Sequence, residues 1–126
     1  MGVSRTSKTP TCIYLANQGI KAANYPLVPH IGISDELNAI KNTQVVALIT
    51  SAHALVEIRR KRSATLGISA VDNDYIDIHK VEEEITAAKR IFANKGWPVI
   101  DITRRSVEET SSAIMNILSQ KEQKNV

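Results

Sequence analysis

The residues best suited to chemistry stand near the start of the sequence, where a glycine is followed at fixed spacing by a serine, a lysine and a threonine. The run is Gly2-Val3-Ser4-Arg5-Thr6-Ser7-Lys8-Thr9, or G-x-x-x-x-S-K-T. It differs at one position from the phosphate-binding loop G-x-x-x-x-G-K-[ST], whose backbone N–H groups surround the phosphates of a nucleotide. The spacing therefore predicts a nucleotide-phosphate site.

The lysine and the threonine of such a loop have different tasks. Lys8 would place a positive charge on the β- and γ-phosphate oxygens, and the hydroxyl of Thr9 would bind magnesium. Pro10 stands in the first turn of the helix that would follow, where proline is accepted. Ser7 can replace the usual glycine only if its φ is tolerated there, because glycine reaches positive φ freely. The alternative is a Ser/Thr-rich turn that merely caps a helix.

Four arginines are further candidates for contacts with phosphate, because guanidinium groups bind phosphate oxygens in a bidentate manner. Arg59 and Arg62 would share one face of a helix. The alternative, which we favour for these two, is a solvated face paired with Glu57. Arg104 and Arg105 follow a predicted strand, and ligands of parallel α/β sheets bind at the carboxyl ends of strands.

The remaining reactive residues predict no site of their own. Asp101 could serve magnesium or could pair with a neighbouring arginine. His30, His53 and His79 lack the spacing of metal ligands. Cys12 is interpreted as a small buried residue rather than an activated thiol. As the single cysteine it excludes an internal disulfide, which agrees with a reducing compartment.

Length and composition are those of one aliphatic globular domain. The chain has 126 residues, of which 43% are hydrophobic, 23% charged and 4% aromatic. A net charge of +3, with acidic and basic residues interleaved, is too small to indicate nucleic-acid binding. No apolar run approaches the roughly 20 residues that cross a bilayer, and no signal peptide is recognised. We therefore expect a cytoplasmic protein without a membrane or nucleic-acid partner.

Helical and strand patterns alternate along the chain. Residues 45–50 form a continuous apolar run, typical of a strand covered on both faces, and Ser106 with Glu109 forms a capping box that opens a last helix. We expect strands at 20–28, 45–50 and 99–102, helices at 10–18, 35–41, 54–66, 79–94 and beyond 106, and a loop at 67–77. This order predicts one P-loop kinase-like domain over residues 1–126, an α/β fold with a parallel sheet flanked by helices.

The helices should turn apolar stripes toward the sheet. The stripe of the fourth helix is the clearest, with spacings of three and four residues. The expected inner residues are Ile13 with Ala16 or Asn17 on the first helix, Ile78, Val81, Ile85, Ala88 and Phe92 on the fourth, and Val107, Ile114, Ile117 and Leu118 on the last.

One part of the expected scaffold has no counterpart in the sequence. A phosphate loop normally leaves the end of a buried strand, and here only Met1 precedes Gly2. We therefore expect the first strand to be missing and Gly2 to be unanchored, at an entropic cost for the loop. An uncovered sheet edge also predicts pairing with another chain, as in a homo-oligomer.

The chain resembles the bacterial and plant pyruvate, phosphate dikinase regulatory proteins and the related phosphoenolpyruvate synthase regulatory proteins. The family accepts serine at the second glycine position of the loop. The resemblance covers nearly the whole chain and rests on the stretches GVSRTSKTPT (2–11), IYLA (13–16), KAANYPLV (21–28), LVEIRR (55–60), FA (92–93), GWPVID (96–101), TRRS (103–106) and EET (108–110).

This resemblance implies a bifunctional regulator. Family members use ADP to phosphorylate a threonine of the dikinase or synthase, and they reverse the modification with inorganic phosphate, releasing pyrophosphate. Residues Gly2 to Thr9 would bind ADP, with Lys8 on its β-phosphate and Thr9 on magnesium. No catalytic base is identified, and residues 51–53 depart from the acidic, proline-containing turn expected in the family.

The resemblance also implies a division of the chain and leaves two alternatives open. Family members carry a large N-terminal region before the loop, so this chain corresponds to their C-terminal, nucleotide-binding half. One alternative is a non-catalytic module that binds a nucleotide or the partner enzyme and oligomerises. The other is a small-molecule P-loop kinase.

Overall fold

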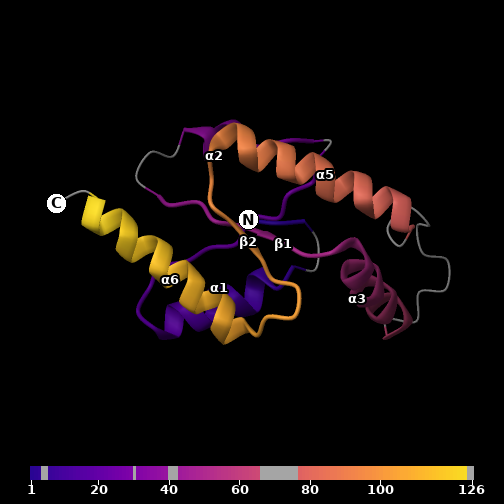
Figure 1. Cartoon of the computed structure of the whole chain (residues 1–126), viewed down its shortest axis with the longest axis horizontal. Coiled ribbons are helices and arrows are strands. Elements are labelled where there is room, and N and C mark those ends of the chain that lie inside the picture. The colour runs from indigo at the N-terminus through magenta and orange to yellow at the C-terminus, as the bar shows by residue number, and fades with distance from the viewer. Residues whose placement is uncertain (4–5, 30, 40–42, 66–76, 125–126) are drawn as a thin grey trace.

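Helices cover both faces of a small parallel sheet (Figure 1). The computed structural model describes residues 1–3, 6–29, 31–39, 43–65 and 77–124. The predicted loop at 67–77 falls outside them except for Asp77. The described elements, in chain order, are α1 (Lys8–Asn17), α2 (Asp35–Asn38), β1 (Ala47–Ile49), α3 (Ala52–Thr65), α5 (Ile78–Lys95), β2 (Val99–Asp101) and α6 (Val107–Lys124).

The centre of the molecule is the parallel pair β1 and β2. Their register joins Ala47 to Val99 and Ile49 to Asp101. One face of this pair is covered by α5, whereas α1 and α6 lie side by side over the other face (Figure 1). Coverage on both faces explains the continuous apolar run of β1, because Ala47 and Leu48 are both buried. The predicted α/β fold with a parallel sheet flanked by helices is confirmed.

Met1 and Gly2 lie alongside β1 in the position where the strand before a phosphate loop would run. The amino group of Met1 donates to the carbonyl oxygen of Val46 at 2.8 Å. The N–H of Leu48 donates to the carbonyl oxygen of Met1, also at 2.8 Å. Residues 1–3 are all buried, which is expected of a strand in this central position.

The opposite edge of Gly2 is also hydrogen-bonded. Its N–H donates to the carbonyl oxygen of Tyr25 at 3.3 Å, and its carbonyl oxygen accepts from the N–H of Leu27 at 2.8 Å. The expectation that Gly2 is unanchored was therefore wrong, because both edges of residues 1–3 are paired. The predicted strand at 20–28 was wrong as well, since it is reduced to one parallel bridge between Gly2 and Pro26. Pro26 has no N–H to continue a ladder.

The core is aliphatic, as the composition predicted, with Phe92 as its buried aromatic residue among those described. The predicted stripe of α5 is confirmed: Val81, Ile85, Ala88 and Phe92 are buried and Ile78 is half-buried. This helix ends at Gly96, whose φ of 68° is the left-handed conformation of a C-terminal cap. The apolar periodicity therefore sets which face of α5 meets the sheet.

The predicted inner faces of α1 and α6 were wrong in detail. On α1 the buried residues are Thr11 and Leu15, whereas Ile13 is 58% exposed. On α6 the buried residues are Thr110 and Ser111, and the four predicted apolar residues are only half-buried. These two helices contact each other, and three of their four buried residues carry a hydroxyl group.

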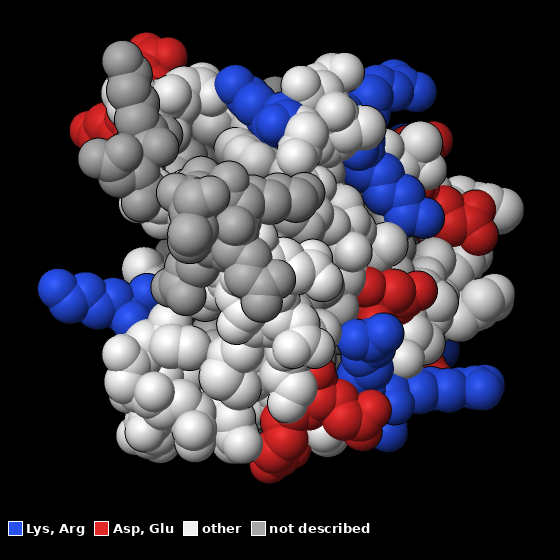
Figure 2. Space-filling model, turned by 60° about the vertical axis from the view of Figure 1, so that its left-hand side comes forward, with Lys and Arg blue, Asp and Glu red and all other residues white. Residues whose placement is uncertain are grey.

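On the face of the molecule in Figure 2, basic and acidic side chains lie next to one another rather than in separate patches. No helix in the described ranges has both the length and the apolar content that crossing a membrane demands.

Candidate functional site

The candidate phosphate loop links the carboxyl end of residues 1–3 to the start of α1. Thr6 is fully buried in it, and its hydroxyl donates to the carbonyl oxygen of Val3 at 2.9 Å. This hydrogen bond connects Thr6 to the residue at which the loop begins. Ser4 and Arg5 of the predicted site lie outside the described residues.

Lys8 reaches back across the loop. Its Nζ donates to the carbonyl oxygen of Val3 at 2.7 Å and lies 3.5 Å from the hydroxyl oxygen of Thr6. Oxygen atoms of Val3 and Thr6 thus lie beside the ammonium group within the loop. An anion bound there would meet a positive charge that is already in position.

Gly2 has no room for a side chain. A Cβ atom on it would lie 2.9 Å from the backbone carbonyl oxygen of Leu48 and closer still to the hydroxyl oxygen of Thr6. The need for glycine therefore comes from close approach of the backbone, which brings the loop against β1.

Ser7 adopts the left-handed conformation at the start of α1, with φ of 59° and ψ of 28°. This is the conformation in which glycine has its advantage, and a non-glycine residue pays roughly 1–2 kcal/mol for it. The side chain of Ser7 makes no capping hydrogen bond that would repay the cost. The serine is thus accommodated in the glycine's conformation rather than changing the course of the loop.

The start of α1 suits a phosphate group. Its first turn contains no acidic residue, and the leading N–H groups of any helix have no acceptor within the helix itself. Thr9, the predicted magnesium ligand, is exposed, and its hydroxyl accepts a hydrogen bond from the side-chain amide of Asn24 at 2.9 Å. The hydroxyl keeps a second lone pair for a metal ion.

No cluster of three or more His, Cys, Asp or Glu side chains that could hold a metal ion occurs among the described residues. Magnesium in nucleotide sites is commonly held by few protein groups together with phosphate oxygens and water. A single threonine hydroxyl beside a phosphate loop fits that pattern.

Cys12 is half-buried on α1, near the loop. Burial raises the pKa of its thiol, and the positive charges of the Met1 amino group and Lys8 only partly oppose this effect. The thiol therefore stays protonated at neutral pH, which supports the interpretation of Cys12 as a structural residue.

A second polar cluster joins the carboxyl ends of β1 and β2. The hydroxyl oxygen of Thr103 accepts from the backbone N–H of Ser51 at 2.9 Å and lies 3.1 Å from the hydroxyl oxygen of Thr50. The N–H of Thr103 donates to a carboxylate oxygen of Asp101 at 2.9 Å. Hydrogen bonds from Thr103 lower the pKa of Asp101, so this carboxylate is ionised at neutral pH.

Reasoning from the sequence singled out Asp101 but missed Thr50 and Thr103. Thr50 directly follows β1, and Thr103 follows β2 after one intervening residue. This is the signal that could have found them, because residues after parallel strands lie at the same end of the sheet. The structure makes Asp101 a hydrogen-bond partner of Thr103.

Arg104 and Arg105 follow this cluster and are exposed. Arg104 has φ of 61°, and the N–H of Arg105 donates to the carbonyl oxygen of Ile102 at 3.0 Å, which closes a turn. Because β1 and β2 run parallel and the bridge at Gly2 is parallel too, this turn lies at the same end of the sheet as the candidate loop (Figure 1).

Arg59 and Arg62 do not share an environment. Arg59 is completely buried, and its two terminal nitrogens bind the two carboxylate oxygens of Glu84 at 2.8 and 2.9 Å. The favoured alternative, a solvated face paired with Glu57, was therefore wrong for Arg59. Its guanidinium joins α3 to α5, whereas Arg62 is exposed in the last turn of α3.

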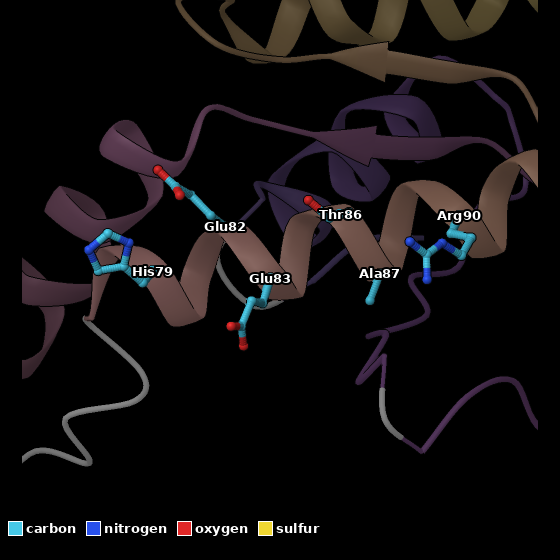
Figure 3. Close-up of a pocket in the computed structure, with 6 residues that line it drawn as sticks. All are labelled: His79, Glu82, Glu83, Thr86, Ala87 and Arg90. Carbon is cyan, nitrogen blue, oxygen red and sulfur yellow. The ribbon is translucent and has the colours of Figure 1, made fainter.

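A pocket also lies along α5, apart from the loop. Figure 3 shows its six labelled residues, which all come from this one helix: His79, Glu82, Glu83, Thr86, Ala87 and Arg90. None of them belongs to the loop or to the cluster around Thr103. The loop and the strand ends are therefore the better candidate site.

Comparison with known proteins identifies the family of this chain. The family model described as kinase/pyrophosphorylase matches residues 1–115, which include the loop and both strands. Similar proteins named pyruvate, phosphate dikinase regulatory protein occur in Caulobacter vibrioides, 56% identical over 94% of this chain and 38% of the relative, and in Bartonella quintana, 53% identical over 94% of this chain and 42% of the relative. In Rhodopseudomonas palustris a protein of the same name is 45% identical over the whole chain and 45% of its own length.

This chain thus spans less than half the length of these relatives. No solved structure matches it. The family model covers most of the chain, so the chain belongs to the kinase/pyrophosphorylase family.

Proposed function

We propose that this chain is the nucleotide-binding part of a bifunctional regulator of pyruvate, phosphate dikinase or of phosphoenolpyruvate synthase. In this role it uses ADP to phosphorylate a threonine of the target enzyme and uses inorganic phosphate to remove that group. The proposal is supported by membership of the kinase/pyrophosphorylase family and by the names of the relatives. Its structural support is the phosphate loop.

The observation that carries the proposal is the position of Lys8. Its ammonium lies 2.7 Å from the carbonyl oxygen of Val3, in a loop whose first residues are hydrogen-bonded on both edges. A loop anchored in this way pays little ordering entropy when a phosphate binds. Lys8 would exchange the carbonyl oxygen of Val3 for oxygens of the ADP β-phosphate.

Thr9 would hold magnesium through its hydroxyl. Asn24, which donates to the same hydroxyl at 2.9 Å, would fix the orientation of the free lone pair toward the metal. When bound, magnesium neutralises charge on the phosphate oxygens.

The chemistry asked of the chain is chiefly positioning and charge stabilisation. In the forward direction the phosphoryl group passes from ADP to the threonine hydroxyl, which loses its proton, and AMP leaves. In the reverse direction orthophosphate takes the phosphoryl group from phosphothreonine, and pyrophosphate leaves while the threonine regains a proton. Lys8 contributes by holding charge that builds up on the oxygens of the transferred group.

The first experiment measures nucleotide binding alone. Isothermal titration of the chain with ADP and magnesium should show saturable binding that Lys8→Ala weakens tenfold or more, since the change removes a charge-assisted bond. Lys21→Ala is the matched control, because it removes an exposed lysine outside the loop. Equal affinities in all three chains would contradict the proposal.

The second experiment tests transfer. The chain is incubated with the dikinase, ADP and magnesium, and phosphothreonine is measured by mass spectrometry, with Lys8→Ala as the inactive control. Binding of ADP without transfer would favour the non-catalytic binding module, which sedimentation would test for oligomers. Transfer to a small molecule but not to the dikinase would favour the small-molecule kinase.

A further inference from the structure

Two non-glycine residues among those described have a left-handed backbone. They are Ser7, with φ of 59°, and Arg104, with φ of 61°. Ser7 belongs to the candidate loop and Arg104 to the turn after β2. These two segments lie at the end of the sheet where the carboxyl ends of the strands meet (Figure 1). Because such a conformation is unfavourable for an L-residue, the surrounding structure has to hold each of them.

The turn at Arg104 is held from both sides in the chain. Before it, Thr103 is fixed by its hydroxyl to the N–H of Ser51 and by its N–H to Asp101, each at 2.9 Å. After it, the N–H of Arg105 donates to the carbonyl oxygen of Ile102. Thr103 thus ties the base of the turn to the end of β1, and the exposed Arg104 follows directly after this fixed residue.

The distance between this turn and the loop suits a second reactant. Residues 1–3 pair with β1, and β1 pairs with β2. With neighbouring strands about 4.8 Å apart, the loop strand and β2 are about 10 Å apart. Between their ends lies the end of β1, with the buried Thr50. This separation is wider than one phosphate group, so the loop and the turn can each bind a group of their own.

The charges around the turn favour an anion over a cation. Arg104 and Arg105 are both exposed. The carboxylate of Asp101 accepts a bond from Thr103, and its other charged neighbours are Lys89 and Arg105. Glu108 and Glu109 lie one turn further on, in the first turn of α6. Along the chain, the two arginines are therefore closer to the end of β2 than the two glutamates are.

We propose that the turn at Arg104 is a second phosphate-binding element, in which Arg104 binds a phosphate group other than that of the nucleotide and Thr103 is its positioning residue. The ligand chemistry is a free or esterified orthophosphate: inorganic phosphate itself, or the phosphothreonine of a protein. That choice of reactants rests on the proposed function, whereas the binding of phosphate at the turn does not.

The test is titration of the chain with inorganic phosphate and, separately, with a phosphothreonine peptide, each followed by phosphorus NMR. Arg104→Ala should weaken binding of at least one of them by about tenfold to a hundredfold, the loss expected for a bidentate charged contact. Arg104→Gly should weaken it equally while favouring the left-handed backbone, so loss of folding cannot explain the effect. Arg90→Ala, which removes an exposed arginine from α5, should change nothing.

The role of Thr103 is tested by a double-mutant cycle with Arg104. Thr103→Val should weaken phosphate binding in the chain that has Arg104 and should have no further effect in the Arg104→Gly chain. Thr103→Ser, which keeps the hydroxyl, should restore binding. Equal effects of Thr103→Val in both backgrounds would overturn the positioning role.

Three results would overturn the proposal as a whole. They are phosphate affinity unchanged in Arg104→Ala, absence of binding by either phosphate ligand, and phosphate binding lost only in Lys8→Ala. Titration with ADP on the same variants separates this from the proposed function, because Arg104→Ala should keep its affinity for ADP. If Arg104→Ala weakens the binding of only one of the two ligands, that ligand is the source of the phosphate group.

Discussion

Arg59 and Glu84 form a two-point ion pair between α3 and α5, with nitrogen–oxygen distances of 2.8 and 2.9 Å. The arginine side chain is fully buried, and that of the glutamate is 25% exposed. The pair connects α3, which begins directly after Ser51, to α5, which covers one face of the sheet. It is thus a structural contact between two helices.

Glu84→Ala should destabilise the chain by about 3 kcal/mol, because it leaves a buried guanidinium without its carboxylate. The measurement is denaturant unfolding followed by circular dichroism. Glu57→Ala is the matched control on α3: this glutamate is exposed, and its loss should change the free energy of unfolding by no more than about 0.5 kcal/mol. A larger effect from Glu57 than from Glu84 would contradict the assignment.

Gly2→Ala should destabilise the chain by about 1–3 kcal/mol, because its methyl group would press on the carbonyl oxygen of Leu48 and the hydroxyl of Thr6. Affinity for ADP should fall as well, since the loop starts at this residue. The double variant Gly2→Ala with Thr6→Gly relieves the contact with the side chain but not that with the backbone of Leu48. It should therefore recover affinity only in part, and full recovery would show that the backbone contact is unimportant.

The sequence predicted those features of the fold that depend on local pattern. The apolar periodicity of α5, the glycine that ends it and the cap at Ser106 were all confirmed, the last by a bond of 3.1 Å from the N–H of Glu109 to the serine hydroxyl. Each depends on residues within a few positions of one another. Such patterns are readable without knowing the rest of the structure.

What failed depends on pairing between distant residues. The anchoring of Gly2 needs Tyr25, Leu27 and β1 to meet, and two residues are too short to show a strand pattern. Likewise, the burial of Arg59 is decided by Glu84, 25 positions further along the chain. The link between Thr50 and Thr103 joins residues 53 positions apart. No local rule predicts these three contacts.

The free energy of unfolding should rise with pH between about 6 and 8 in a chain whose amino terminus is Met1. Burial, and after it the positive charge of Lys8, lower the pKa of the Met1 amino group from 8.0 to about 6. The unfolded chain therefore binds more protons in this window, so unfolding becomes less favourable as pH increases. Two pKa units correspond to about 3 kcal/mol. Urea unfolding at several pH values measures the slope, and acetylating the amino group should remove it. An equal slope after acetylation would contradict this origin.

Ser7→Gly should stabilise the chain by about 1 kcal/mol, because it restores the residue suited to φ of 59° and Ser7 makes no capping bond that would be lost. Ser7→Ala is the control: it removes the hydroxyl but keeps the strain, so its stability should stay within about 0.5 kcal/mol of the parent. Thermal unfolding measures both. If Ser7→Gly were less stable than Ser7→Ala, the hydroxyl would have a function in the loop that its conformation does not reveal. Higher stability with unchanged affinity for ADP would mean that serine at this position costs stability without contributing to nucleotide binding.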